Sequence, residues 1–188
     1  MQGDESLPGT YRVDDHSKVE FSEALTSWIP IAYGELLGTA RRYNAVVTYK
    51  ELSETVQDTS GIRTRSLLTN WIGDLLEQVA LRAQASGEPP LTSLCVHQDG
   101  TIGPGYARAP KAVSDEPGDD IELYAAKHRL LCYQKYADDL PPDGGEPTFT
   151  KAVAERRAKS IPRRVTPVVT CPVHNIAVPA NGRCDFCE

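Results

Sequence analysis

The sequence predicts a mainly α-helical fold with a small β-hairpin and a separate metal-binding tail. Three observations lead to this prediction. Apolar residues recur at helical spacing in several stretches before residue 137, a glycine-rich turn signal lies among them, and two short pairs of metal-ligand residues lie near the C-terminus. With 188 residues, 40% of them hydrophobic, the chain has room for one ordinary domain and appendages.

The first helical pattern covers residues 19–43, where we expect Pro30 to divide it into two helices or to kink one. A short β-prone run then leads to Thr48, which can cap a brief helix. Glu51 follows three residues later, as in a capping box. The broad apolar stripe of residues 66–85 predicts the clearest helix of the chain.

After this helix the pattern changes to that of a strand and a turn. Leu91, Leu94 and Val96 are followed by Asp99-Gly100, a strong hairpin signal. A short helix, a loop, a longer helix and a hairpin form the order of a winged helix-turn-helix. That order assigns residues 66–85 to the recognition helix and the hairpin to the wing. Beyond the wing, a last amphipathic helix is expected over residues 121–136.

The tail carries the most specific chemistry. Cys171-Pro-Val-His174 and Cys184-Asp-Phe-Cys187 supply four ligands of the kind that a closed tetrahedral zinc site requires, with turn-forming residues between them. Catalytic zinc sites keep an open position, so we expect one structural Zn²⁺ in a zinc knuckle or ribbon. So short a segment depends on metal binding for most of its folding free energy, about 10 kcal/mol in zinc peptides.

Charge is distributed unevenly over a chain of net charge −6. Residues 151–188 contain seven Lys or Arg against three Asp or Glu, a local charge of +4. This part of the chain is therefore best able to neutralise phosphates, although a basic run is also compatible with a solvated helix face. The candidate phosphate contacts in it are Arg156, Arg157, Arg163 and Arg164.

These patterns divide the chain into five parts. The parts are a flexible N-terminus (1–17), a helical winged-helix-like domain (18–138), a Pro/Gly-rich linker (139–147), a basic segment (148–168) and a zinc-binding tail (169–188).

The winged-helix-like part resembles the DNA-binding domain of the alkylguanine-DNA alkyltransferases and alkyltransferase-like proteins over about 60 residues. The resemblance lies in Thr48-Tyr49-Lys50-Glu51-Leu52, Trp71-Ile72-Gly73-Asp74-Leu75-Leu76, Pro89-Pro90, Asp99-Gly100 and Gly103 through Tyr106. It implies a winged helix that binds DNA. Tyr49 then matches a tyrosine that assists nucleotide flipping, and Asn70 matches the arginine that replaces the flipped base in the stack. The residues themselves also allow a purely packing role for Tyr49.

The family's Pro-Cys-His-Arg signature, which carries the alkyl-accepting thiol, is met here by Pro90-Leu91-Thr92-Ser93. The nucleophile is absent, and Cys95 lies on a strand that we expect to be buried, so dealkylation is not predicted. Arg63 and Arg65, at the start of the long helix, are placed to contact phosphates.

The sequence therefore predicts a non-enzymatic protein that binds nucleic acid, with DNA expected, or a nucleoprotein complex. One alternative is a protein-interaction adaptor or inhibitor that docks on a larger complex, and another is a subunit of a DNA-processing enzyme. No membrane association is expected, because no apolar run approaches about 20 residues and the N-terminus lacks a secretory signal. Cys95 and Cys132 lie outside the zinc motif as free thiols, which suits the cytoplasm.

Overall fold

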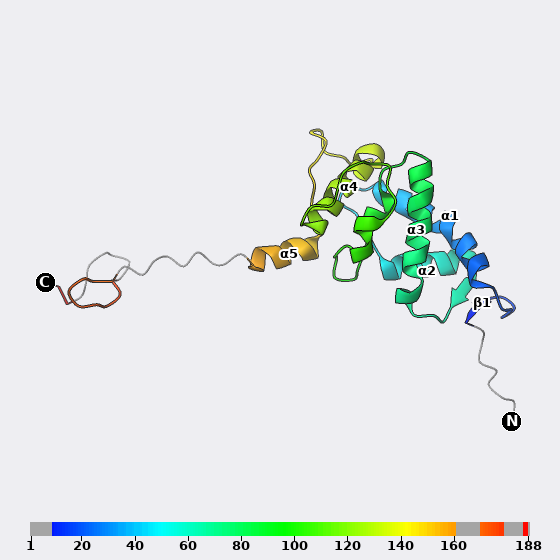
Figure 1. Cartoon of the computed structure of the whole chain (residues 1–188), viewed down its shortest axis with the longest axis horizontal. Coiled ribbons are helices and arrows are strands. Elements are labelled where there is room, and N and C mark those ends of the chain that lie inside the picture. The colour runs from blue at the N-terminus through cyan, green and yellow to red at the C-terminus, as the bar shows by residue number, and fades with distance from the viewer. Residues whose placement is uncertain (1–8, 161–169, 179–185, 188) are drawn as a thin grey trace, which may run out of the picture. The chain divides into compact units, whose positions relative to one another are not determined.

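Helices dominate the computed structural model, which describes residues 9–160, 170–178 and 186–187 (Figure 1). The helices are α1 (Phe21–Ala40), α2 (Tyr49–Ser60), α3 (Ile72–Ala85), α4 (Ile121–Tyr136) and α5 (Lys151–Ser160). Three short 3-10 helices lie between them: η1 (Leu68–Asn70), η2 (Leu91–Leu94) and η3 (Pro104–Arg108). The mainly α prediction is confirmed. The chain forms two compact units, Met1–Glu155 and Arg156–Glu188, which are described separately.

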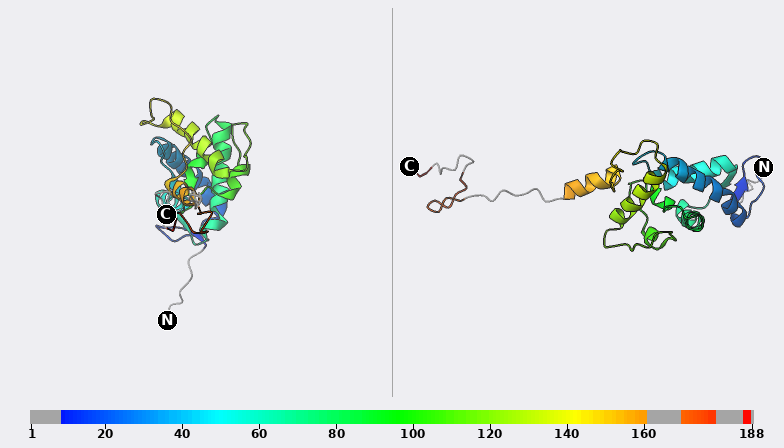
Figure 2. Two further views of the ribbon diagram at one scale, coloured as in Figure 1. Left: turned by 90° about the vertical axis from the view of Figure 1, so that its left-hand side faces the viewer. Right: turned by 90° about the horizontal axis from the view of Figure 1, so that it is seen from above.

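Four short strands form two small sheets in the first unit. β1 (Thr10–Arg12) pairs antiparallel with β3 (Ile62–Thr64), and β2 (Val47–Thr48) pairs in parallel with β4 (Cys95–Val96). β1 lies within the segment predicted to be a flexible N-terminus, and the Val19 amide also donates to the Thr10 carbonyl. Figure 1 and the right-hand view of Figure 2 place β1 at one end of this unit and α4 toward the other.

The core of the first unit is built around α1. This helix packs against α2, α3, α4 and η2, and its fully buried Trp28 lies 4.8 Å from the ring of Trp71, between centroids. α1 continues through Pro30 as one helix, so the predicted division did not occur. Contacts on several sides of α1 compensate for the amide donor that the proline removes.

Local signals placed α2 and α4 correctly. Thr48 and Glu51 form both hydrogen bonds of the predicted capping box, and Gly61 ends α2 in the left-handed conformation, with φ of 67°. α4 begins and ends at the predicted residues, and the Asp120 side chain caps it by accepting from the Leu123 amide.

The helix predicted over residues 66–85 begins later, at Ile72. Residues 68–70 form η1 instead, and Trp71, with φ of −139°, interrupts the helical backbone before α3. Trp71 thereby turns its ring into the core, where it is 2% exposed. Burial of this large ring outweighs the helical preference of the preceding leucines.

The predicted hairpin forms as a turn without a second strand. The Gly100 amide donates to the His97 carbonyl, and the His97 amide donates to the Thr101 carbonyl. The chain then enters η3, and no strand is assigned to residues 97–104. β4 finds its partner in β2 instead, so a two-stranded wing is not present in this part of the chain.

Residues 138–150, which include the predicted linker, form hydrogen bonds with earlier segments of the first unit. The Asp138 amide donates to the Arg41 carbonyl, and the Tyr43 hydroxyl bonds both the carbonyl and the amide of Glu146. The Thr150 hydroxyl donates to the Gly100 carbonyl. In the described part of the chain, no helix has the length and apolar character needed to span a bilayer.

Candidate functional sites

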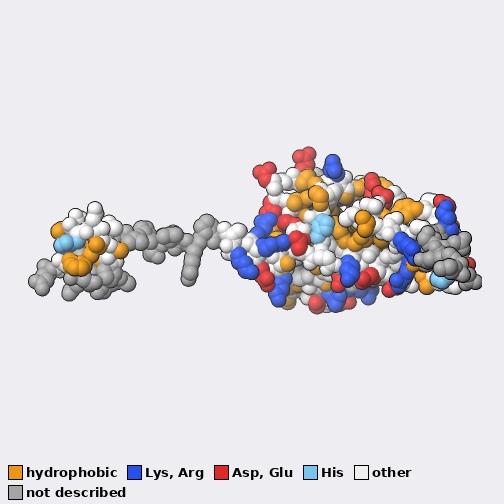
Figure 3. Space-filling view, turned by 90° about the horizontal axis from the view of Figure 1, so that it is seen from below, with side chains coloured by type: hydrophobic (Ala, Val, Ile, Leu, Met, Phe, Trp, Pro, Cys, Tyr) orange, Lys and Arg blue, Asp and Glu red, His pale blue; other side chains and the backbone are white. Residues whose placement is uncertain are grey.

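A cavity of about 720 Å³ opens on the first unit where α2, η1, α3, η2, η3 and the turn after β4 meet. Most of its lining is apolar or aromatic, and its volume falls within the range of small-molecule sites. The lining residues include Tyr49, Thr92, His97 and Tyr106. In the view of Figure 3, hydrophobic side chains lie above and to the right of an exposed histidine on this unit, and charged side chains lie to its left.

Tyr49 and His97 form the aromatic wall of the cavity. Their ring centroids are 4.6 Å apart and the ring planes meet at 64°, an edge-to-face arrangement. Tyr49 is the first residue of α2, and His97 directly follows β4. Burial raises the pKa of Tyr49 to about 12, so this hydroxyl stays protonated at neutral pH and can donate a hydrogen bond.

Gly103 allows the Tyr49 ring to occupy its place. A Cβ atom at residue 103 would collide with the tyrosine hydroxyl, whereas the glycine amide donates a hydrogen bond to that oxygen. A side chain at residue 103 would therefore displace Tyr49 and change the shape of the cavity.

Both signs of charge occur around the cavity. Lys50 and Arg108 supply positive charge, while Asp74 and Glu77 lie along α3, and all four side chains are exposed. The cavity therefore has no single strong potential.

One wall of the cavity is fixed by a buried histidine. The Tyr106 hydroxyl lies 2.7 Å from Nδ1 of His128, and Nε2 of the same ring lies 2.9 Å from an Asp115 carboxylate oxygen. Lys111 donates to the carbonyls of Tyr106, Ala107 and Ala109, which holds the end of η3. These contacts anchor the segment that carries the wall.

The predicted nucleic-acid residues of the first unit are only partly brought together. Tyr49 lines the cavity, and Asn70 is exposed on η1 beside the cavity residues Leu68 and Thr69. Arg65 is also exposed, and no ion pair joins it to a carboxylate within the described ranges.

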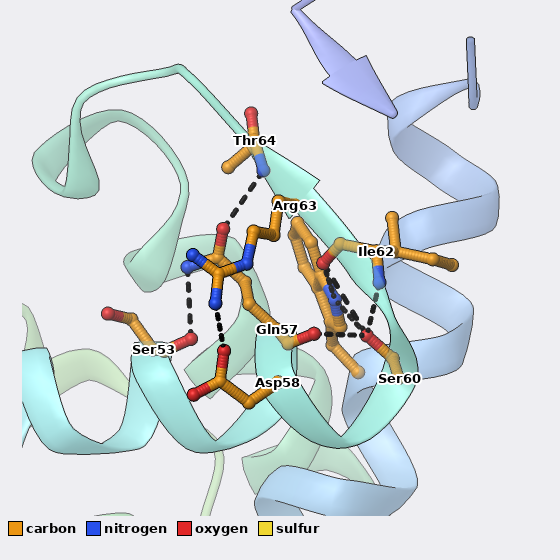
Figure 4. Close-up of polar contacts among 8 residues, drawn as sticks. Ser53, Gln57, Asp58, Ser60, Ile62, Arg63 and Thr64 are labelled. Atoms are coloured by element: carbon orange, nitrogen blue, oxygen red, sulfur yellow. Dashed lines mark hydrogen bonds and ion pairs between the residues drawn. The ribbon is translucent and has the colours of Figure 1, made fainter. Parts of the chain in front are cut away.

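Arg63 is engaged within the protein. One of its guanidinium nitrogens lies 2.5 Å from a carboxylate oxygen of Asp58 on α2, as Figure 4 shows. The same view shows the Thr64 amide donating to the side chain of Gln57, so β3 is held along α2. A phosphate contact by Arg63 would have to compete with Asp58.

The predicted basic residues are divided between the described and undescribed parts of the chain. Arg156 and Arg157 lie exposed on α5. Arg163 and Arg164 lie outside the described residues, so their proposed phosphate contacts stay predictions.

The residues that replace the family's thiol motif are buried. Leu91 and Cys95 are both fully buried, and burial raises the pKa of the Cys95 thiol well above its usual value. Cys95 is therefore neither accessible nor activated as a nucleophile.

In the tail, three of the four predicted zinc ligands converge. Sγ of Cys171 lies 3.8 Å from Nδ1 of His174 and 3.6 Å from Sγ of Cys187, and the last two atoms are 3.3 Å from each other. Tetrahedral zinc bonds of about 2.3 Å to sulfur and 2.0–2.1 Å to nitrogen imply ligand separations of about 3.6–3.8 Å. Two of the three separations lie in this range and the third is shorter, and the group as a whole can hold a metal ion. Cys184 lies outside the described residues.

The backbone around Cys171 favours a metal-binding thiolate. Its amide donates to the Ile176 carbonyl, and its carbonyl accepts from the amide of Asn175, whose φ of 55° closes the turn. The amides of His174 and Val173 donate to the sulfur, which lowers the pKa of Cys171 to about 6. A thiolate at neutral pH is the form that binds zinc.

Sequence reasoning did not bring Thr92, His97 and Gly103 together with Tyr49 in one cavity. Each lies 43 or more residues from Tyr49, so no local pattern joins them. The available signal was that Tyr49 and His97 each follow directly on a short β-prone run. No protein-family model, curated protein or solved structure matches this chain.

Proposed function

We propose that this chain is a non-enzymatic nucleic-acid-binding protein whose first unit is a degenerate alkyltransferase-like winged-helix module without the two-stranded wing. The observation that carries the proposal is the cavity walled by Tyr49 and His97 beside α3. The resemblance assigns Tyr49 to nucleotide flipping, and this tyrosine lines a cavity of suitable size. In this proposal the cavity receives a base that has left the duplex stack.

The cavity walls support an unpaired base as the occupant. Aromatic side chains bind bases of any sequence through their π-faces, at about 1–3 kcal/mol per stacked base. Arg108 at the cavity supplies a cation for the flanking phosphates, and Lys50 supplies another in competition with Glu54, which lies 3.8 Å from it. With Cys95 buried and Leu91 at the position of the thiol, the proposed interaction is non-covalent.

The proposed role of the tail is to add electrostatic affinity. Arg156 and Arg157 on α5, with Arg163 and Arg164 beyond it in the sequence, neutralise phosphates, and one structural zinc ion orders the Cys/His segment. Cys95 and Cys132 are buried free thiols, which supports a reducing compartment such as the cytoplasm.

The test is binding of the full zinc-loaded chain to two labelled DNA duplexes, one fully paired and one with a single mismatch, followed by fluorescence anisotropy. At about 50 mM salt both duplexes should bind, and affinity should fall steeply as salt rises. The mismatched duplex should bind more tightly, because an unpaired base costs less to extrude. No binding of either duplex at about 50 mM salt would overturn the proposal.

Variants separate the two parts of the proposed function. Tyr49→Ala should reduce the preference for the mismatched duplex, whereas Arg156→Ala with Arg157→Ala should weaken both duplexes equally. Tyr33→Ala is the matched aromatic control, because Tyr33 packs under Arg82 and does not line the cavity. Equal loss of mismatch preference in the Tyr33 variant would contradict the role of the cavity.

A second candidate, a protein-interaction adaptor, is favoured by one feature of the tail. Val173, Ile176 and Phe186 lie exposed around the Cys/His group, and Phe186 is 71% exposed. Apolar side chains on a small rigid module suit a protein partner. This function would appear as a stoichiometric complex that Phe186→Ser abolishes while DNA binding is unchanged.

A further inference from the structure

Thr92 presents an unusual polar group in the wall of the cavity. The residue is 5% exposed, and its hydroxyl oxygen has no hydrogen-bond partner among the described residues. Buried hydroxyls in folded proteins almost always have a partner, because an unpaired one loses its bonds to water without replacement. An unpaired hydroxyl beside a cavity therefore points to a partner that arrives with a ligand.

The polar groups near the Thr92 hydroxyl have hydrogen bonds of their own. It lies in η2, where all four residues are buried, and its carbonyl already accepts from the Cys95 amide. The neighbouring Ser93 hydroxyl has a contact of its own, 3.9 Å from the sulfur of Cys132. The Thr92 hydroxyl itself makes no hydrogen bond that would hold this element within the described residues.

The hydroxyl can reach the cavity without breaking any bond. A threonine side chain carries a methyl group and a hydroxyl on the same carbon, and rotation about χ1 exchanges their places between staggered positions. Thr92 already lines the cavity, and its hydroxyl has no partner to lose. Such a rotation therefore costs no hydrogen bond in the free protein.

We propose that Thr92 is the specificity residue of the cavity, and that its hydroxyl bonds the polar edge of a heterocyclic base whose face lies against Tyr49 and His97. This inference rests on the proposed function and adds the chemical class of the occupant. A hydrocarbon or alkyl group in the cavity would leave the hydroxyl unpaired. A base supplies nitrogen or oxygen atoms along its edge, and a hydroxyl can donate to either or accept from an amino group.

The test uses the isosteric change Thr92→Val in the full zinc-loaded chain. The variant replaces an unpaired hydroxyl with a methyl group, so the free protein should melt at the same temperature as the wild type or higher. Its affinity for the mismatched duplex should fall about tenfold, the loss expected for one hydrogen bond in a dry site. Its affinity for the paired duplex, measured at the same salt concentration, should change little.

Two further variants sharpen this result. Thr92→Ser keeps the hydroxyl and should retain the mismatch preference, while Thr26→Val, an exposed threonine on α1 that does not line the cavity, should leave it unchanged. Unchanged mismatch binding by Thr92→Val would overturn the inference while the proposed function stands. Equal weakening of both duplexes with a lower melting temperature would also overturn it, because Thr92 would then be structural. Failure of the wild type to bind any duplex would overturn the proposed function itself.

Discussion

Tyr106 and His128 are joined by a 2.7 Å hydrogen bond in which the phenol donates to Nδ1 of the imidazole. This direction follows from the other ring nitrogen. Nε2 lies 2.9–3.0 Å from both oxygens of Asp115, and because a carboxylate accepts hydrogen bonds, Nε2 must carry the ring hydrogen. His128 is fully buried, so one neutral imidazole connects η3 and the 109–119 segment to α4.

This arrangement makes stability depend on pH in a defined direction. Burial lowers the pKa of His128, and this effect is larger than the opposite effect of Asp115. The imidazole is therefore protonated at a lower pH in the folded protein than in the unfolded chain. The stability contributed by the neutral ring is complete above about pH 6.5 and declines as pH falls below that value. The melting temperature should therefore be lower at pH 5.5 than at pH 7.5.

The control for this prediction removes the imidazole. His128→Gln should be less stable at pH 7.5 and should have a smaller change in melting temperature over the same interval. His16→Gln, at an exposed turn, should keep the wild-type pH dependence. An equal pH dependence in wild type and His128→Gln would exclude His128 as the responsible group.

Gly145 should not tolerate a side chain. Its φ is 70°, and a Cβ atom would lie 2.7–2.9 Å from atoms of the Tyr43 ring. Tyr43 in turn packs edge-on against Tyr133, at 5.6 Å between centroids. Gly145→Ala should lower the free energy of unfolding by about 1–3 kcal/mol in urea denaturation. Gly118→Ala, with no neighbour within 4 Å, should have little effect.

The capping box at the start of α2 gives a second stability prediction. The Thr48 hydroxyl accepts from the Glu51 amide at 3.2 Å and also accepts from the Gln98 side chain at 3.3 Å. Thr48→Ala should therefore cost about 1 kcal/mol, measured by the urea midpoint. Thr48→Ser retains the oxygen and should recover most of the loss. A neutral Thr48→Ala variant would show that the cap contributes no net stability.

Metal removal should affect the tail alone. The purified wild type should contain one equivalent of zinc, and Cys171→Ser or Cys187→Ser should lose it, because each removes one of the converging ligands. Cys132→Ser removes a buried thiol elsewhere and should keep the metal. Chelation should leave the main melting transition unchanged, because that transition belongs to the separate first unit. A Cys184→Ser, Cys187→Ser protein that retained one equivalent would refute the assigned ligands.

Local sequence signals predicted local structure well. The Thr48–Glu51 spacing and the apolar pattern of residues 121–136 depend on neighbours within a few residues, and both elements form as expected. The Cys171–His174 pair is equally local, and its ligand atoms converge with that of Cys187.

Features that depend on distant partners were not predicted. The turn at Asp99-Gly100 was interpreted as a hairpin, but β4 pairs with β2, about 48 residues earlier, because burial of both strands favours that pairing. Pro30 is accommodated by tertiary contacts that the sequence does not display. The cavity combines residues from five elements, so its lining became visible only in the fold.

The small parallel sheet of β2 and β4, with two residues in each strand, determines when the binding site forms during folding. Val47 is opposite Cys95 and Thr48 is opposite Val96, so the next residues along the two parallel strands, Tyr49 and His97, emerge side by side. A slip of one residue would turn one of the two rings to the other face. The aromatic wall therefore cannot precede global folding, and ligand binding and cooperative unfolding should be lost at the same denaturant concentration.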